Sequence, residues 1–326
     1  MPSLARFLCL PDVVPARMVV AQFTLAGVLV APLLMAQAPQ DNAAPPPPSP
    51  IALQNPIPGS ELMFLNGFAG KPVKELLKDK AFINLTKQIV PKTTYHYGRD
   101  MALSFAVDDV LDGSKLPVML RDGRYLMVSG DRGPYLRGRG FLWFDLQEGV
   151  ALGGFFFTPT NGEPTPTLTI FSKQVDTHEL AMSELPQAFV QDLYQWEEIE
   201  KVPPVSPRYF IPVNGKKYVL VHDEDYCWHP DGAPAPDPNA CQEMNAAAAD
   251  ADLNAAYFMH LTRNAADATA WMLEPEQVAW LDLRERSCFG PDRLACRIHM
   301  ARERTWTLIG GPPPKAPRAR PRQASR

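Results

Sequence analysis

The sequence predicts an α+β fold, in which an antiparallel sheet with packed helices is followed by a small disulfide-tied all-helical domain. Three observations support this prediction. Short apolar segments separated by turn residues fill the middle of the chain, and segments with helical spacing flank them. The last third is rich in alanine, shows helical spacing without a strand pattern, and contains four cysteines.

Composition sets the broad class. The chain has 326 residues, of which 46% are hydrophobic, and this is enough for one large or two medium domains. The net charge of -4 gives no reason to expect nucleic acid as a partner. Proline, with 35 residues, has about twice its average share, and it concentrates in residues 39–58 and in the tail from Pro312.

The first 38 residues are predicted to be a signal peptide. Arg6 and Arg17 precede the apolar segment Met18–Met35, and Ala36-Gln37-Ala38 is a small-x-small cleavage site. We therefore expect a periplasmic or secreted protein. The alternative is an uncleaved segment that anchors the chain in the membrane, since 18 residues are just enough to span it.

The remaining chain divides into four parts. Residues 39–60, with Pro45–Pro48, are predicted to be a Pro-rich linker, and residues 61–222 an α+β domain. Residues 223–309 are predicted to form the helical domain, and residues 310–326 a disordered basic tail.

In the α+β domain a helix is expected from about Lys71 until Pro91, and a second from Ser183 through Glu200. The pairs Asp122-Gly123 and Asn214-Gly215 are typical of hairpin turns. The expected strands are 102–110, 116–120, 124–129, 141–146, 150–158, 167–173, 208–213 and 217–221.

In the helical domain, residues 228–240 are either a second linker or a disulfide-tied loop. Three helices follow: one after Cys241, one over Glu276–Cys288 and one over Leu294–Leu308. Once Cys9 has left with the signal segment, Cys227, Cys241, Cys288 and Cys296 remain, an even number that favours two disulfides. Three pairings are open. Zinc is less favoured because no Cys-x-x-Cys pair is present.

The richest group of chemical side chains is the segment His222–His229. It is compatible with a metal or acid/base site, but we favour an acidic strand end followed by a disulfide cysteine. No nucleophile elbow, phosphate loop or glycosidase-like carboxylate pair occurs, so we predict no catalytic residues, no metal, no cofactor and no enzyme. Trp280 and Phe155–Phe157 are interpreted as core more readily than as binding patches.

The segment from Lys71 to Trp196 resembles the inhibitor of vertebrate lysozyme (Ivy) family. Its matching pieces are Glu75–Phe82, Arg124–Gly130, Phe141–Asp145 and Gly149–Phe157. The resemblance implies an antiparallel sheet with packed helices, and a loop that enters the lysozyme cleft.

In that family the loop contains two cysteines that close a ring around a histidine, and this sequence has neither residue type there. The corresponding residues, which are predicted to be the partner-binding loop, are Asp131, Arg132, Gly133, Pro134, Tyr135, Leu136 and Arg137. Arg132 and Arg137 are suited to pair with carboxylates, and Tyr135 to fill a sugar subsite. The alternative is a polar hairpin loop without this role.

Residues from about Cys227 to Leu308 resemble the LprI-type lysozyme-inhibitor N-terminal domain family. The resemblance rests on Gln242–Asn245, Asp250–Tyr257, Trp280–Cys288 with Cys296, and Arg304. Trp280, Arg284 and Cys288 recur every four residues and therefore share one helix face. Family members often have a cysteine where Ala246 stands, so the partner of Cys241 stays open.

Both resemblances lead to the same functional hypothesis. We expect an exported envelope protein that binds and inhibits lysozyme-type muramidases by occluding the active-site cleft. The alternative is a structural or interaction module of a periplasmic or envelope assembly. In either case the expected partner is a protein, and a membrane is involved only through an uncleaved signal segment. The sequence leaves the oligomeric state and the partner's identity open.

Overall fold

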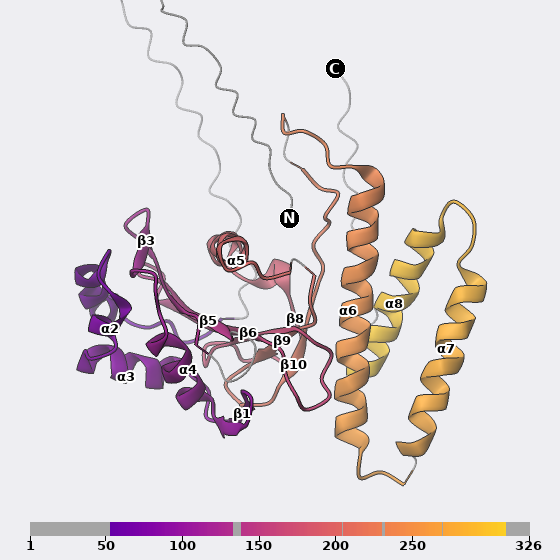
Figure 1. Cartoon of the computed structure of the whole chain (residues 1–326), viewed down its shortest axis with the longest axis horizontal. Helices are drawn as coiled ribbons and strands as arrows, with labels where there is room; N and C mark the ends of the chain where they lie inside the picture. Colours follow the sequence, from indigo (N-terminus) through magenta and orange to yellow (C-terminus); the bar gives the residue numbers. More distant parts are fainter. Residues whose placement is uncertain (1–52, 133–137, 204, 230–231, 269, 311–326) are drawn as a thin grey trace, which may run out of the picture. The chain divides into compact units, whose positions relative to one another are not determined.

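The computed structural model describes residues 53–132, 138–203, 205–229, 232–268 and 270–310 (Figure 1). The predicted signal segment, linker residues 39–52 and the tail beyond residue 310 lie outside this range. Among the helices of the described part, none has the length and apolar character needed to cross a membrane.

The chain joins the fold earlier than the predicted linker boundary at residue 60. Leu53 forms a β-bridge with Val175, and the Ile57 amide donates to the Gly149 carbonyl at 2.8 Å. Residues 53–60 thus pack on the sheet region. The helical turns α1 (Gly59–Leu62) and η1 (Met63–Phe68) follow.

The single helix predicted from Lys71 is two helices, α2 (Val73–Leu76) and α3 (Lys80–Ile89). The break lies at Asp79, whose extended backbone and carboxylate, accepting from the amides of Ala81 and Phe82, make it the N-cap of α3. Side chains at helical spacing on α3 are buried in the core, so the predicted helical periodicity is confirmed there. The N-cap at Asp79 explains why the helix is divided.

One strand prediction was wrong. Residues 102–110 lie mostly in helix α4 (Leu103–Asp112), whose buried residues Leu103, Ala106, Val107, Val110 and Leu111 follow a helical period. This helix packs directly on the sheet at Gly130, where a Cβ atom would lie only 2.0 Å from the Val110 carbonyl oxygen. The residue types of this segment also occur in strands, but burial of one helical face against the sheet stabilises the helix instead.

The main sheet has eight strands in the order β3-β4-β5-β6-β7-β9-β10-β8. Its pairings are antiparallel except for β7 with β9 and β10 with β8, which are parallel. The strands are β3 (Met119–Arg121), β4 (Tyr125–Gly130), β5 (Arg139–Asp145), β6 (Val150–Phe157), β7 (Thr167–Phe171), β8 (Leu180–Ala181), β9 (Arg208–Ile211) and β10 (Tyr218–Val221). A separate hairpin pairs β1 (Thr94–His96) with β2 (Asp100–Ala102).

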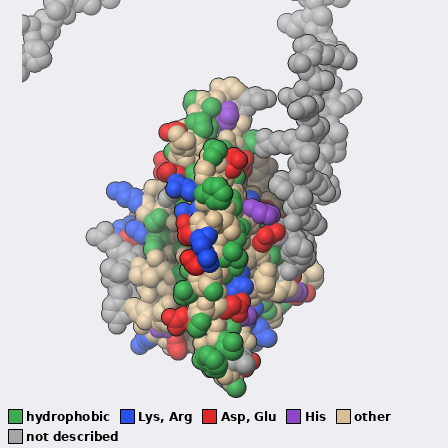
Figure 2. Space-filling model, turned by 90° about the vertical axis from the view of Figure 1, so that its right-hand side faces the viewer, with side chains coloured by type: hydrophobic (Ala, Val, Ile, Leu, Met, Phe, Trp, Pro, Cys, Tyr) green, Lys and Arg blue, Asp and Glu red, His purple; other side chains and the backbone are tan. Residues whose placement is uncertain are grey.

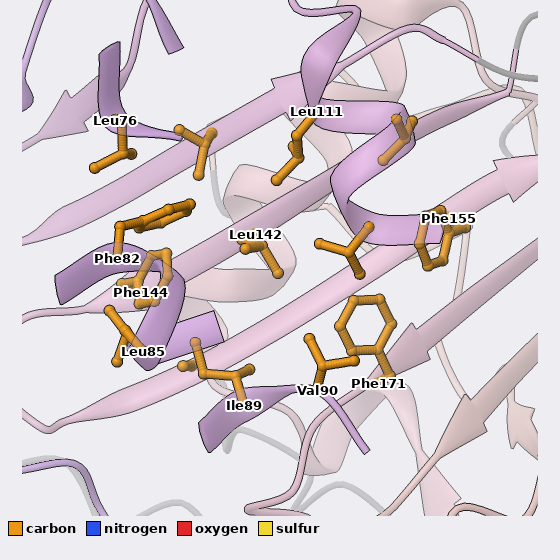
Figure 3. Packing of buried hydrophobic residues seen from close by; sticks show 14 of the residues in the cluster. Leu76, Phe82, Leu85, Ile89, Val90, Leu111, Leu142, Phe144, Phe155 and Phe171 are labelled. Carbon is orange, nitrogen blue, oxygen red and sulfur yellow. The ribbon is translucent and has the colours of Figure 1, made fainter. Parts of the chain in front are cut away.

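Both faces of the sheet are covered. On one face, α2, α3 and α4 bury apolar side chains against Leu142, Phe144, Phe155 and Phe171 (Figure 3). On the other face, α5 (Gln187–Glu200), preceded by η2 (Met182–Glu184), places Phe189, Leu193 and Trp196 against the sheet. The Phe155–Phe157 run is buried, which confirms that it belongs to the core.

The region after residue 237 is helical, with α6 (Pro238–Asn264), η3 (Ala270–Met272), α7 (Leu273–Ser287) and α8 (Arg293–Ile309). α6 and α8 share an apolar cluster that includes Tyr209 of β9 and Val219 of β10. The predicted fold class, a sheet with packed helices followed by a disulfide-tied helical region, is confirmed.

Candidate protein-binding surfaces

The predicted inhibitory loop connects β4 with β5, and only its start is described. Gly133, Pro134, Tyr135, Leu136 and Arg137 lie outside the described residues, whereas Asp131 and Arg132 lie within them. The Asp131 carboxylate pairs with the ammonium group of Lys115, next to the end of α4. The loop therefore starts at an ion pair that ties it to the α4–β3 connection.

Arg132 is held by α4. Its guanidinium pairs with the carboxylate of Asp112 and lies 3.6 Å (Nε to Oδ1) from that of Asp109. Its carbonyl oxygen accepts a 2.7 Å hydrogen bond from the Tyr97 hydroxyl. The side chain is 55% exposed, but its charge is already compensated by two carboxylates. Arg132 is therefore a weaker candidate for pairing with a partner's carboxylate than the sequence indicated.

Tyr97 also supports the far end of this loop. A Cβ atom at Gly138 would lie 1.9 Å from the Tyr97 hydroxyl oxygen, so only glycine allows this close approach. Burial raises the pKa of Tyr97 well above its ordinary value, with the Asp109 carboxylate adding to the effect. Both ends of the loop are thus positioned by one buried tyrosine.

The segment His222–His229 forms a structural junction between the sheet and α6. The His222 amide and Nδ1 contact the two carboxylate oxygens of Asp252, at 2.8 and 2.5 Å. Asp223 accepts from the amide and hydroxyl of Ser183. No group of three metal-ligating side chains occurs among the residues that the structure describes.

Glu224 belongs to a buried charge cluster at this junction. It pairs with Arg208 of β9 at 2.5 Å and accepts from the Tyr194 hydroxyl at 2.7 Å. Burial is the largest single effect and raises the pKa of Glu224, but the charge of Arg208, with further contributions that include the hydrogen bond from Tyr194, lowers it more, so the pKa of this carboxyl lies below its usual value. Arg208 is fully buried, and its Nη2 lies 3.9 Å from the Glu197 carboxylate of α5.

Glu197 has the opposite balance. Burial raises the pKa of its carboxyl to about 7, because the opposing effect of Arg208 is smaller and the Glu224 charge adds to the rise. The charged groups of this cluster therefore come from three elements: Glu197 from α5, Arg208 from β9, and Glu224 from the segment that leads to α6.

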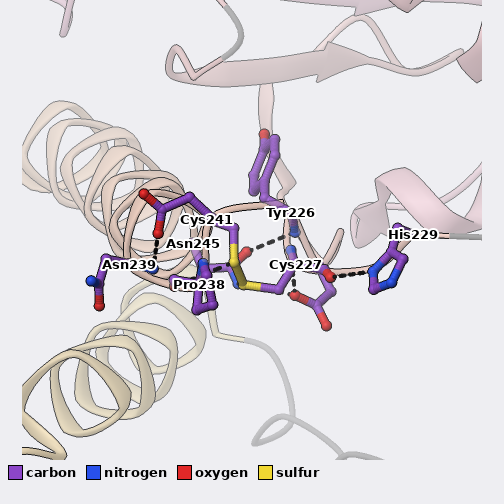
Figure 4. Close-up of a disulfide and its surroundings, with 9 residues drawn as sticks. Tyr226, Cys227, His229, Pro238, Asn239, Cys241 and Asn245 are labelled. Atoms are coloured by element: carbon purple, nitrogen blue, oxygen red, sulfur yellow. Dashed lines mark hydrogen bonds between the residues drawn. A yellow bond between two sulfur atoms is a disulfide. The ribbon is translucent and has the colours of Figure 1, made fainter. Parts of the chain in front are cut away.

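The structure resolves the cysteine pairing. Cys227 bonds to Cys241, and Cys288 bonds to Cys296. The first disulfide ties the segment after β10 to the first turn of α6, so residues 228–240 form a disulfide-tied loop (Figure 4). Asn245 reinforces the same join: its side-chain oxygen accepts from the Tyr226 amide at 3.0 Å, and its amide group donates to Asp225 at 3.0 Å.

The residues that carry the second resemblance are mostly structural. Asp250 of α6 accepts from Arg284 of α7 at 2.6 Å and from Arg297 of α8 at 3.1 Å, which joins the three helices. The guanidinium of Arg284 also lies 5.3 Å from the ring centroid of Trp280. Trp280 packs on the helical core, as predicted, and shares its helix face with Arg284.

Arg304 completes these cross-links by binding the Glu276 carboxylate of α7 at 2.8 Å. Together, Asp250, Arg284 and Arg304 hold the three helices against one another. These motif residues therefore act as part of the scaffold.

Comparison with known proteins supports this assignment for the helical region. The family model described as lysozyme inhibitor LprI matches residues 229–308. Neither the curated proteins nor the solved structures contain a match to this chain. The matched segment covers α6, α7 and α8 with most of the disulfide-tied loop, so the helical region is similar to a lysozyme-inhibitor domain.

Proposed function

We propose that this protein is exported to the cell envelope, where it binds and inhibits lysozyme-type muramidases. The observation that carries the proposal is the match of residues 229–308 to the LprI lysozyme-inhibitor family. The cross-links of the matched region, through Asp250 and the two disulfides, support a rigid module that is suited to protein binding.

Export is part of the proposal. Disulfides form and persist in oxidising compartments, so the Cys227–Cys241 and Cys288–Cys296 bonds fit a periplasmic or secreted protein. Fractionation of producing cells tests this point: the mature chain should be recovered from the periplasm or the medium, with a mass reduced by residues 1–38. Recovery of the full-length chain in the membrane fraction would indicate the anchored alternative.

The proposed mechanism is steric occlusion of the muramidase cleft, to which the 131–137 loop contributes. Because two carboxylates of α4 already compensate Arg132, we expect Arg137 and Tyr135 to make the larger contributions to inhibition. An inhibition assay against c-, g- and i-type lysozymes tests the function, with Arg132→Ala, Tyr135→Ala and Arg137→Ala as probes. Arg99→Ala, at an exposed position on the β1–β2 turn, is the matched control.

Inhibition of one class that is weakened by Arg137→Ala and Tyr135→Ala, and unchanged by Arg99→Ala, supports both function and mechanism. Inhibition that none of the loop variants changes would contradict the loop mechanism only. If no class is inhibited, the function itself is wrong. Capture of a membrane assembly from envelope extracts, without muramidases, would then favour the alternative of a structural interaction module.

A further inference from the structure

The described part of the chain concentrates its exposed apolar side chains around α7. Six of the thirteen large apolar side chains exposed there lie between residues 271 and 289: Trp271, Met272, Val278, Leu281, Leu283 and Phe289. Figure 2 views the molecule from this side, where apolar side chains recur with both carboxylates and cationic side chains among them. Such concentration on a short segment is typical of a protein-binding surface.

This exposure follows from how α7 packs. α6 and α8 form the apolar core of the helical region, to which α7 contributes Trp280. The buried residues of α7 are the polar Gln277 and Arg284, and its hold on the other helices is mainly by ion pairs to Asp250 and Arg304. A helix retained by polar contacts on its inner side leaves its apolar side chains available outside.

Four outward residues of α7 share one helix face: Glu274, Val278, Leu281 and Asp282, at spacings of four, seven and eight residues from the first. We refer to these four residues as the α7 surface. All four are exposed, whereas Gln277 and Arg284, which flank Leu281 on the helix, are buried and Trp280 is half-buried. The α7 surface thus combines two aliphatic side chains with two carboxylates.

The charge of this stretch indicates the chemistry of the partner. Residues 270–292 contain five carboxylates and two arginines, a net charge of -3. Arg284 is turned inward to Asp250, and Arg286 pairs with Asp282. Arg304 and Arg297 of α8 pair with two further carboxylates of the stretch, Glu276 and Glu285, so Glu274 carries the uncompensated negative charge of the α7 surface. An acidic surface with exposed aliphatic side chains is complementary to a cationic protein surface with apolar side chains of its own.

We propose that the α7 surface is where this protein holds its muramidase, and that it binds a cationic part of that enzyme outside the catalytic cleft. This inference rests on the proposed function, and the matched inhibitor segment contains all of α7. Apolar contacts of Val278 and Leu281 slow the dissociation of the complex, and the charge of Glu274 increases the association rate.

The test measures binding of the full mature chain to a c-type lysozyme by surface plasmon resonance, followed by g- and i-type enzymes if the first does not bind. We expect Val278→Ser with Leu281→Ser to weaken affinity about tenfold or more, mainly through faster dissociation. Glu274→Lys should slow association about fivefold at low salt, with the effect fading as ionic strength rises. Acetylation of the lysozyme's lysines should weaken wild-type binding as well.

Matched controls come from the sheet region. Ile83→Ser with Phe105→Ser removes two exposed apolar side chains from α3 and α4, and Glu198→Lys reverses an exposed charge on α5. Thermal melting near the wild-type temperature verifies folding of each variant. Binding by the α7 variants equal to that of these controls overturns the inference and leaves the proposed function standing. Absence of binding to all three lysozyme classes overturns both.

Two other occupants of the α7 surface are distinguished by further measurements. If Val278→Ser with Leu281→Ser converts a dimer to a monomer in sedimentation, the surface joins two copies of the chain, and the inference is wrong. If removal of residues 311–326, which contain five cations, raises lysozyme affinity tenfold, the tail of the chain itself occupies this surface, and the inference is wrong. Unchanged affinity after removal supports the inference.

Discussion

Glu197 provides the sharpest quantitative prediction. Its side chain is buried near Arg208 and Glu224, and burial raises the pKa of its carboxyl to about 7. In the unfolded chain the same group titrates near its ordinary value of 4.5. Glu197→Gln keeps the shape of the neutral acid but cannot ionise, so it isolates the effect of this one charge on stability.

The sign follows from linkage. The folded protein holds the proton more tightly than the unfolded chain, so the stability contributed by this group is fully present below pH 4.5 and is lost as pH rises through about 7. Each unit of pKa difference corresponds to about 1.4 kcal/mol. Relative to wild type, Glu197→Gln should therefore gain about 2–3 kcal/mol of unfolding free energy between pH 5 and pH 8.

Urea denaturation followed by tryptophan fluorescence at pH 5, 6, 7 and 8 measures this difference, with the m-value as a check on the two-state assumption. Glu198→Gln is the matched control, because Glu198 is the next residue of α5 and is exposed. Its stability should parallel wild type across the range. If the two variants have parallel pH profiles, or if the gain for Glu197→Gln shrinks as pH rises, the burial argument is wrong.

Three further changes test the scaffold. Replacing Cys288 and Cys296 by serine opens a short loop and should lower the free energy of unfolding by about 2–3 kcal/mol, measured as a lower melting temperature in oxidising buffer. Added reductant should then lower the melting temperature of this variant only through the Cys227–Cys241 bond. Asp250→Asn weakens the ion pairs to the arginines of α7 and α8 and should cost about 1–3 kcal/mol, with faster amide hydrogen exchange in α7 as the diagnostic; protection lost equally in the sheet would contradict a local role. Gly130→Ala places a methyl group against the Val110 carbonyl and should cost about 1–3 kcal/mol or more in urea denaturation, whereas a neutral result would mean that α4 shifts freely on the sheet.

Much of the sheet could be predicted from local signals. The turn pairs Asp122-Gly123 and Asn214-Gly215 lie between strands that do pair, and the expected strands in 141–158 match β5 and β6 closely. The parallel pairing of β7 with β9 was not predictable, because the chain between them contains β8 and α5 and only their packing decides where β9 enters the sheet. The strand prediction for residues 102–110 was wrong for a related reason. β-branched and aromatic residues are compatible with a strand or a helix, and burial in the fold selects one of them.

The candidate site divides in the same way. The residues of the helical motif could be identified from their spacing, but not the contacts they make: Asp250 and Arg284 are 34 positions apart, and Asp250 and Arg297 are 47 apart. Similarly, Arg132 had the side chain expected of a carboxylate-binding loop. Only the fold places Asp109 and Asp112 of α4 beside it and compensates its charge.

The sequence by itself determined most strands of the main sheet, the helical character of the C-terminal region, the number of cysteines available for disulfides, and the likeness of that region to a lysozyme-inhibitor family. These depend on local periodicity, turn chemistry and composition, which are properties of neighbouring residues. Tertiary structure alone decided which cysteines pair, which charges are buried together around Arg208, and that α7 keeps its apolar residues exposed. The physical reason is that burial and ion pairing depend on distance in space, and folding brings together residues that the chain holds far apart.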